Sequence, residues 1–109
     1  MQVFESHYEN LMSEFVYNYS VESIAAADGD LDILIDVLQK SESKAVAKDE
    51  NGWEPIHEAV RGGHVDAVQV LIVYGADIHQ GESSLTLSLE EHGHDHPMTV
   101  FLKSQGASE

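Results

Sequence analysis

Residues 49–77 read DENGWEPIHEAVRGGHVDAVQVLIVYGAD, and this stretch decides the fold. Asn51 and Gly52 predict a tight turn, because both residue types tolerate a positive φ. Pro55 suits the first turn of a helix, where its missing N–H would have no intrahelical partner. The apolar residues that follow recur at spacings of three and four, as on one face of a helix: Ile56, Ala59 and Val60.

A second helix is predicted directly after the first. Gly62 and Gly63 end the first helix, because glycine adopts the left-handed cap conformation without a Cβ clash. Gly75 closes the second helix. The apolar positions between these glycines again follow a helical spacing: Val65, Val68, Leu71 and Ile72. The stretch therefore predicts two antiparallel helices preceded by a projecting turn.

Residues 49–77 resemble one ankyrin repeat over nearly their whole length. The family pattern is D-x-x-G-x-T-P-L-H-x-A-A-x-x-G-H, then an apolar helix, then G-A-D. The resemblance implies an all-α fold, an ankyrin-type helix-turn-helix solenoid. It also implies a scaffold that binds other proteins rather than an enzyme.

Weaker copies of this pattern flank the clear one. Upstream, Ala25 to Asp30 corresponds to Ala59 to His64 at a spacing of 34 residues, although Glu22 stands where the family places leucine. Downstream, Gly106-Ala107 echoes Gly75-Ala76. The alternation of Leu85, Leu87 and Leu89 also fits a strand, but the repeat spacing favours a helix. We expect about three repeats, at residues 20–48, 49–78 and 79–109.

Residues 1–19 have apolar and aromatic side chains at spacings of three and four, which predicts an amphipathic helix. We interpret it as an N-terminal capping helix that covers the exposed face of the first repeat, with residues 20–109 forming the repeat domain. The alternative is a dimer contact or a connector to another domain.

Composition and charge exclude several classes of function. The chain has 109 residues, no cysteine and a net charge of −15, from 20 acidic and five basic residues. Such a charge repels phosphate backbones and anionic lipid, so we expect no nucleic-acid or membrane partner. It would attract a basic protein surface. No apolar run reaches the length of a membrane span or forms a signal peptide. We expect a monomer in the cytoplasm or nucleus.

The histidines are candidates for chemistry, but each has a structural interpretation. His92, His94 and His96 alternate and would chelate a metal if extended, yet they fall at the repeat's inter-helix turn, so we expect no metal and no cofactor. His57 occupies the T-P-L-H histidine position, with Glu54 as the substitute for threonine and expected partner of the imidazole. No nucleophile or oxyanion donor accompanies this pair.

The binding surface is predicted from the positions that the family leaves variable. In ankyrin repeats these positions project from the turn and first helix onto the concave face, and carried over by match they are Glu50, Asn51, Trp53 and Arg61. Trp53 is the only tryptophan, and an exposed indole contributes a large contact area at low entropic cost. Its alternative role is packing against the adjacent turn.

The sequence thus predicts a non-catalytic protein–protein interaction module. Two alternatives remain. The chain could be the accessory ankyrin domain of a larger enzyme. It could also be the substrate of an asparaginyl or histidinyl hydroxylase, because His79 occupies the position after G-A-D-I where the family usually carries asparagine.

Overall fold

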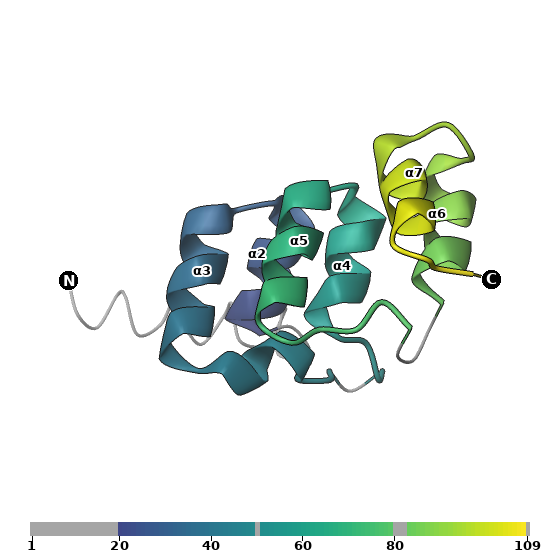
Figure 1. Cartoon of the computed structure of the whole chain (residues 1–109). Coiled ribbons are helices and arrows are strands. Elements are labelled where there is room, and N and C mark those ends of the chain that lie inside the picture. The colour runs from purple at the N-terminus through teal and green to yellow at the C-terminus, as the bar shows by residue number, and fades with distance from the viewer. Residues whose placement is uncertain (1–19, 50, 80–82, 109) are drawn as a thin grey trace.

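The computed structural model describes residues 20–49, 51–79 and 83–108, and these form three antiparallel helix pairs laid side by side (Figure 1). A short 3₁₀ helix, η1 (Glu42–Val46), follows the first pair. No described residue lies in a strand. The pairs are α2 (Val21–Asp28) with α3 (Leu31–Lys40), α4 (Pro55–Gly62) with α5 (Val65–Val73), and α6 (Ser84–His92) with α7 (Pro97–Ser104). The all-α, helix-turn-helix prediction is confirmed.

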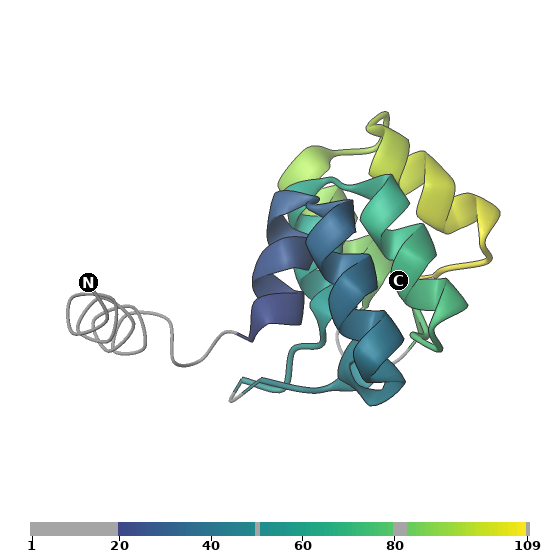
Figure 2. The same cartoon turned by 90° about the vertical axis from the view of Figure 1, so that its left-hand side faces the viewer.

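The helices form two layers, which Figure 2 shows from the side of the first pair. The first helices are one layer, in which α4 contacts both α2 and α6. The second helices are the other, in which α5 contacts both α3 and α7. The middle pair is therefore the only described one with neighbours on both sides, and the core runs through it.

Local sequence explains where each helix begins and ends. Pro55 and Pro97 stand in the first turn of α4 and α7, where a proline removes no helical hydrogen bond. Gly29 and Gly63 cap α2 and α4 with φ of 71° and 77°. Leu85 and Leu87 are buried in the helix α6, so the helical interpretation of that segment is confirmed. The core joins all three pairs through buried aliphatic side chains: Leu34, Leu38, Ile56, Val60, Val68, Leu71, Met98 and Leu102.

Gly62 brings the first two pairs into close contact. A Cβ atom placed on this residue would lie 2.5 Å from the backbone oxygen of Ala27 in α2. His64 fills the neighbouring space, since a Cβ on Gly29 would lie 2.5 Å from its Nδ1. The Gly-His turn of the pattern therefore packs the first and second units closely against each other.

The third unit is held partly by buried hydroxyl groups. Ser88 and Thr99 are both fully buried, and their oxygens lie 2.7 Å apart. Thr99 also donates to the backbone oxygen of Gly93 at 2.6 Å. The Ser88 hydroxyl can then donate to the Thr99 oxygen, which satisfies both groups inside the core.

The outer side of the first unit differs from the polar face expected of a terminal repeat. Glu22 is buried, whereas Val21, Ile24 and Ile33 are 56%, 39% and 47% exposed. The predicted capping helix, residues 1–19, lies outside the described residues. Its position stays a prediction.

Candidate binding site

A tight turn at residues 49–53 positions the candidate site. The Asp49 carboxylate accepts hydrogen bonds from the backbone N–H groups of Asn51 at 2.8 Å and Trp53 at 2.9 Å. The Asp49 N–H donates to the Trp53 backbone oxygen at 2.8 Å, and Gly52 has a φ of +83°. One carboxylate therefore fixes both ends of the turn, as Asp does in an Asx-turn. The turn predicted from Asn51-Gly52 is confirmed.

Trp53 is both packed against the rest of the protein and accessible for binding, the two roles that the sequence left open. The side chain is half-buried and packs against the hydrophobic core. Its ring centroid lies 5.6 Å from that of His57, with the two planes tilted by 52°. Its remaining surface lines a pocket. The indole is thus anchored by packing and still accessible, which suits a rigid binding residue.

His57 helps to hold the start of α4. Its Nδ1 accepts a hydrogen bond of 3.0 Å from the backbone N–H of Glu54, and the Glu54 side chain reciprocally caps the His57 backbone. The expected pairing of the Glu54 carboxylate with the imidazole is therefore replaced by a capping box. Because Nδ1 is an acceptor, the neutral ring carries its proton on Nε2.

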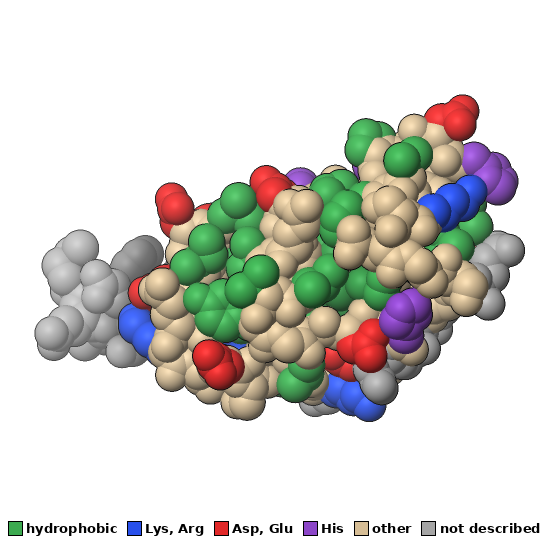
Figure 3. Space-filling view, in the orientation of Figure 1, with side chains coloured by type: hydrophobic (Ala, Val, Ile, Leu, Met, Phe, Trp, Pro, Cys, Tyr) green, Lys and Arg blue, Asp and Glu red, His purple; other side chains and the backbone are tan. Residues whose placement is uncertain are grey.

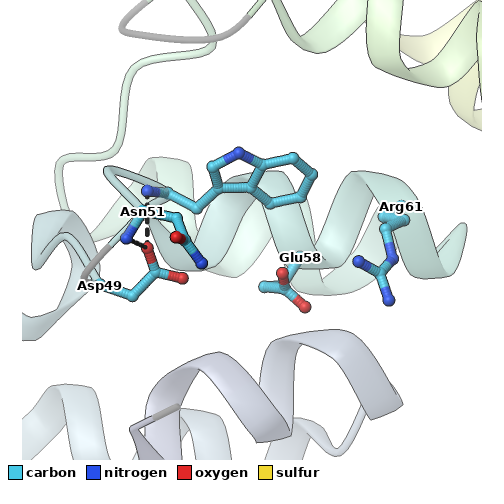
Figure 4. A pocket seen from close by; sticks show the side chains of 5 residues that line it. Asp49, Asn51, Glu58 and Arg61 are labelled. Atoms are coloured by element: carbon cyan, nitrogen blue, oxygen red, sulfur yellow. Dashed lines mark hydrogen bonds between the residues drawn. The ribbon is translucent and has the colours of Figure 1, made fainter. Parts of the chain in front are cut away.

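The turn and the exposed side of α4 enclose a pocket of about 250 Å³. Its lining residues are Asp49, Asn51, Trp53, Glu58 and Arg61. Figure 4 shows Asp49 and Asn51 at one end, Arg61 at the other and Glu58 between them. Three of the four predicted binding residues meet here. The fourth, Glu50, lies outside the described residues.

Glu58 is the unusual member of this set. Its side chain lines the pocket although the residue is only 6% exposed. Burial raises the pKa of the Glu58 carboxyl above its ordinary value, and the nearby Asp49 charge raises this pKa further, against the lowering effects of Arg61 and His57. A carboxylate held in such surroundings costs folding free energy when it is charged.

Replacing Glu58 with glutamine should therefore stabilise the protein at neutral pH. The pKa of Glu58 is higher in the folded than in the unfolded protein, so stability falls as the pH rises from the unfolded-state pKa through the folded-state pKa. The cost of the charged carboxylate to folding is therefore present at pH 7 and absent below about pH 4. We expect the melting temperature to rise by about 2 °C at neutral pH and not to rise at acid pH. Thermal unfolding monitored by circular dichroism measures both values.

The matched control is Glu90→Gln, which removes the same charge from an exposed position in α6. It separates local burial from relief of the general negative charge. Equal melting temperatures for the two variants at pH 7 would refute the assignment of a strained carboxylate.

Asp49 and Glu58 were missed by the sequence reasoning. The signal for Asp49 was present in the D-x-N-G order, since an Asp two residues before Asn and four before Trp can cap both amides. Glu58 lies three residues before Arg61, hence on the same side of α4.

The alternating histidines do not form a chelating set. His92 donates from Nε2 to the Val60 backbone oxygen at 2.8 Å, and His96 accepts at Nδ1 from the Met98 N–H at 3.0 Å. The two rings stack with centroids 4.3 Å apart, while His94 is exposed. Among the described residues no three His, Cys, Asp or Glu side chains are placed to hold a metal ion. His92 and His96 instead connect α6 and α7 to the end of α4.

His79 is exposed at the end of the second unit. Its backbone N–H donates to the Asp77 carboxylate at 2.8 Å, so the residue stands on an ordered turn. The residues that follow, 80–82, lie outside the described residues.

Charge and hydropathy complete the description of the surface. Acidic side chains are scattered across the face formed by α3, α5 and α7, with apolar side chains between them (Figure 3). The ion pair among the described residues is Lys40 with Asp36, both exposed. No described helix has the length and hydrophobicity needed to cross a membrane.

The comparisons with known proteins agree with this arrangement. A family model described as ankyrin repeats, three copies, matches residues 14–108. The predicted domain boundary after residue 19 stays a prediction. No solved structure matches the chain.

Curated relatives match parts of the chain, among them the following three. An ankyrin repeat-containing protein of Schizosaccharomyces pombe is 46% identical over 55 residues, 50% of this chain and 26% of that protein. The 2-5A-dependent ribonuclease of Mus musculus is 38% identical over 56 residues, 51% of this chain and 8% of the enzyme. Human ankyrin repeat domain-containing protein 49 is 40% identical over 43 residues, 39% of this chain and 18% of that protein. The matched stretch thus spans at most 26% of the length of any of these three relatives.

Proposed function

Because the chain belongs to the ankyrin repeat family, whose members generally bind proteins, we propose that it is a non-catalytic module that docks a protein partner. The docking surface is the turn at residues 49–53 together with the exposed side of α4. The observation that carries the proposal is the pocket in which Asn51, Trp53 and Arg61 meet. We place the protein, as a monomer, in the cytoplasm or nucleus.

The geometry of the turn supports this function. Trp53 is held by the Asp49 hydrogen bonds and by packing against His57, so little conformational entropy remains to be lost on binding. Tryptophan and arginine are the residue types most often found at the energetic centre of protein interfaces. The pocket between them is large enough to receive one side chain of a partner.

The test is affinity capture from a lysate of the source cells with the wild type and Trp53→Ala. We expect Trp53→Ala to weaken the specific partner by about 30-fold or more, because a central interface residue contributes about 2 kcal/mol or more. Affinity of the identified partner is then measured by calorimetry.

The control is Val100→Ala, which truncates an exposed apolar side chain of α7 instead. It should capture the same partner with unchanged affinity, and both variants should keep the helical circular dichroism of the wild type. Undiminished binding by folded Trp53→Ala would place the docking surface elsewhere.

A second candidate is an accessory domain of a larger enzyme. The observation that favours it is the similarity to the 2-5A-dependent ribonuclease, in which the matched stretch is a small part of an enzyme. Identification of a longer reading frame with a catalytic domain would support it. The further alternative, hydroxylation at His79, is supported by the exposure of that residue, and its readout is one added oxygen on the peptide containing His79 in mass spectra of the native protein.

A further inference from the structure

The pocket beside Trp53 combines an aromatic wall with carboxylates. Asp49 and Glu58 contribute two acidic groups, Trp53 contributes the indole, and Arg61 is the one basic lining residue. An aromatic face attracts a cation, and a carboxylate accepts charge-assisted hydrogen bonds from it. The chemistry of the lining therefore favours a positively charged occupant over a neutral or anionic one.

Glu58 has neither a hydrogen bond nor an ion pair with any described residue, although the residue as a whole is buried. Its exposed fraction is 6%, and its carboxylate belongs to the pocket lining. Asp49 differs, because its carboxylate already accepts the two amide hydrogen bonds of the turn. The Glu58 oxygens open into the pocket and have no donor from the described residues, so Glu58 is the carboxylate here that a donor from a partner can reach.

Arg61 does not supply that donor. It projects from the same side of α4 as Glu58, but no ion pair joins the two side chains within 4 Å (Figure 4). Arg61 is an exposed residue at the end of the pocket. The attraction from Arg61 also fails to offset burial, since the pKa of Glu58 is still raised. The pocket of about 250 Å³ that Glu58 and Trp53 both line has room for a second cation.

We propose that this pocket receives the side chain of a lysine or arginine from the protein partner, with the cation against the Trp53 indole and hydrogen-bonded to the Glu58 carboxylate. This inference rests on the proposed function and specifies which chemistry the partner presents. The net charge of −15 supports it, because an acidic molecule attracts basic segments from a distance.

The test uses the fluorescence of Trp53, which is the only tryptophan and so reports on this pocket alone. The probes are acetylated and amidated peptides of sequence Gly-X-Gly, with X as lysine, arginine, glutamine or methionine. At neutral pH and low salt we expect the lysine or the arginine peptide to bind about tenfold more tightly than the two neutral ones. The stronger of the basic pair identifies the preferred side chain.

Glu58→Gln should lower the affinity for the basic peptide by about tenfold and leave the affinities for the neutral peptides unchanged. Glu90→Gln, with the same loss of charge at an exposed site, should bind like the wild type. Lowering the pH through the raised pKa of Glu58 protonates its carboxylate. The affinity for the basic peptide should therefore fall more in the wild type than in Glu58→Gln. Equal binding of the lysine, arginine and glutamine peptides, or undiminished binding by folded Glu58→Gln, would overturn the inference.

The two proposals fail in different ways. If capture of the native partner depends on Trp53 but is the same for Glu58→Gln and Glu90→Gln, the docking surface stands and the cation assignment is wrong. If capture is independent of Trp53, the docking surface itself is wrong, whatever the peptides show.

Discussion

Replacing Leu71 with alanine should cost about 3–5 kcal/mol of the free energy of unfolding, enough to leave much of the protein unfolded at 37 °C. Leu71 is fully buried and lies on helix α5, which contacts both α3 and α7. The cavity left by the substitution therefore weakens both interfaces of the middle unit. In a stack where each unit contacts only its neighbours, loss of the middle one separates the other two.

Leu102→Ala is the matched comparison, because Leu102 is also fully buried and lies on α7, the second helix of the third unit. It borders one neighbouring unit only, so we expect a smaller loss, with faster hydrogen exchange confined to α6 and α7. Urea unfolding followed by circular dichroism gives both free energies. A loss for Leu102→Ala as large as that for Leu71→Ala would contradict the central role of the second unit.

Gly62→Ala should also destabilise the protein, although alanine is favoured over glycine within a helix by about 1 kcal/mol. Gly62 is the last residue of α4, and the new Cβ would lie 2.5 Å from the Ala27 backbone oxygen. That oxygen belongs to α2 and cannot rotate away as a side chain would, so the two helices must separate. We expect a net loss of about 1–2 kcal/mol and a melting temperature lower by about 5–10 °C.

The control for Gly62→Ala is Gln69→Ala, an exposed position in α5 where alanine meets no such obstacle. Gln69→Ala should change the melting temperature by no more than about 2 °C. A melting temperature raised by Gly62→Ala would show that α2 and α4 do not approach each other as closely as the structure has them.

The fold was predictable because the second unit satisfies several local rules at once. The turn dipeptide, Pro55 at the helix start, the capping Gly63 and the apolar spacing all indicate the same helix-turn-helix. The flanking units lack some of these signals. Their helices were predicted instead from their spacing in sequence relative to the second unit. The leucines at positions 85, 87 and 89 show why the repeat period was needed. Over five residues, a strand-like alternation and a helical spacing are hard to distinguish.

The site was only partly predictable, because its special features depend on contacts between separate segments. Family position indicated Asn51, Trp53 and Arg61, but it carried no information on the burial of Glu58. Nor could spacing show that Glu54 caps the His57 backbone, or that the His92 and His96 rings stack against each other. Burial and ring orientation are set by packing between helices, which no single segment encodes.

The central claim is that a partner protein docks on the turn at residues 49–53, and site-specific photocrosslinking tests it most directly. A benzophenone amino acid replaces Asn51 in one variant and Val100 in another, both of which are exposed positions. The captured partner is then added and the mixture irradiated. We predict a crosslinked product from position 51 and none from position 100. A crosslink from position 100 without one from position 51 would contradict the account.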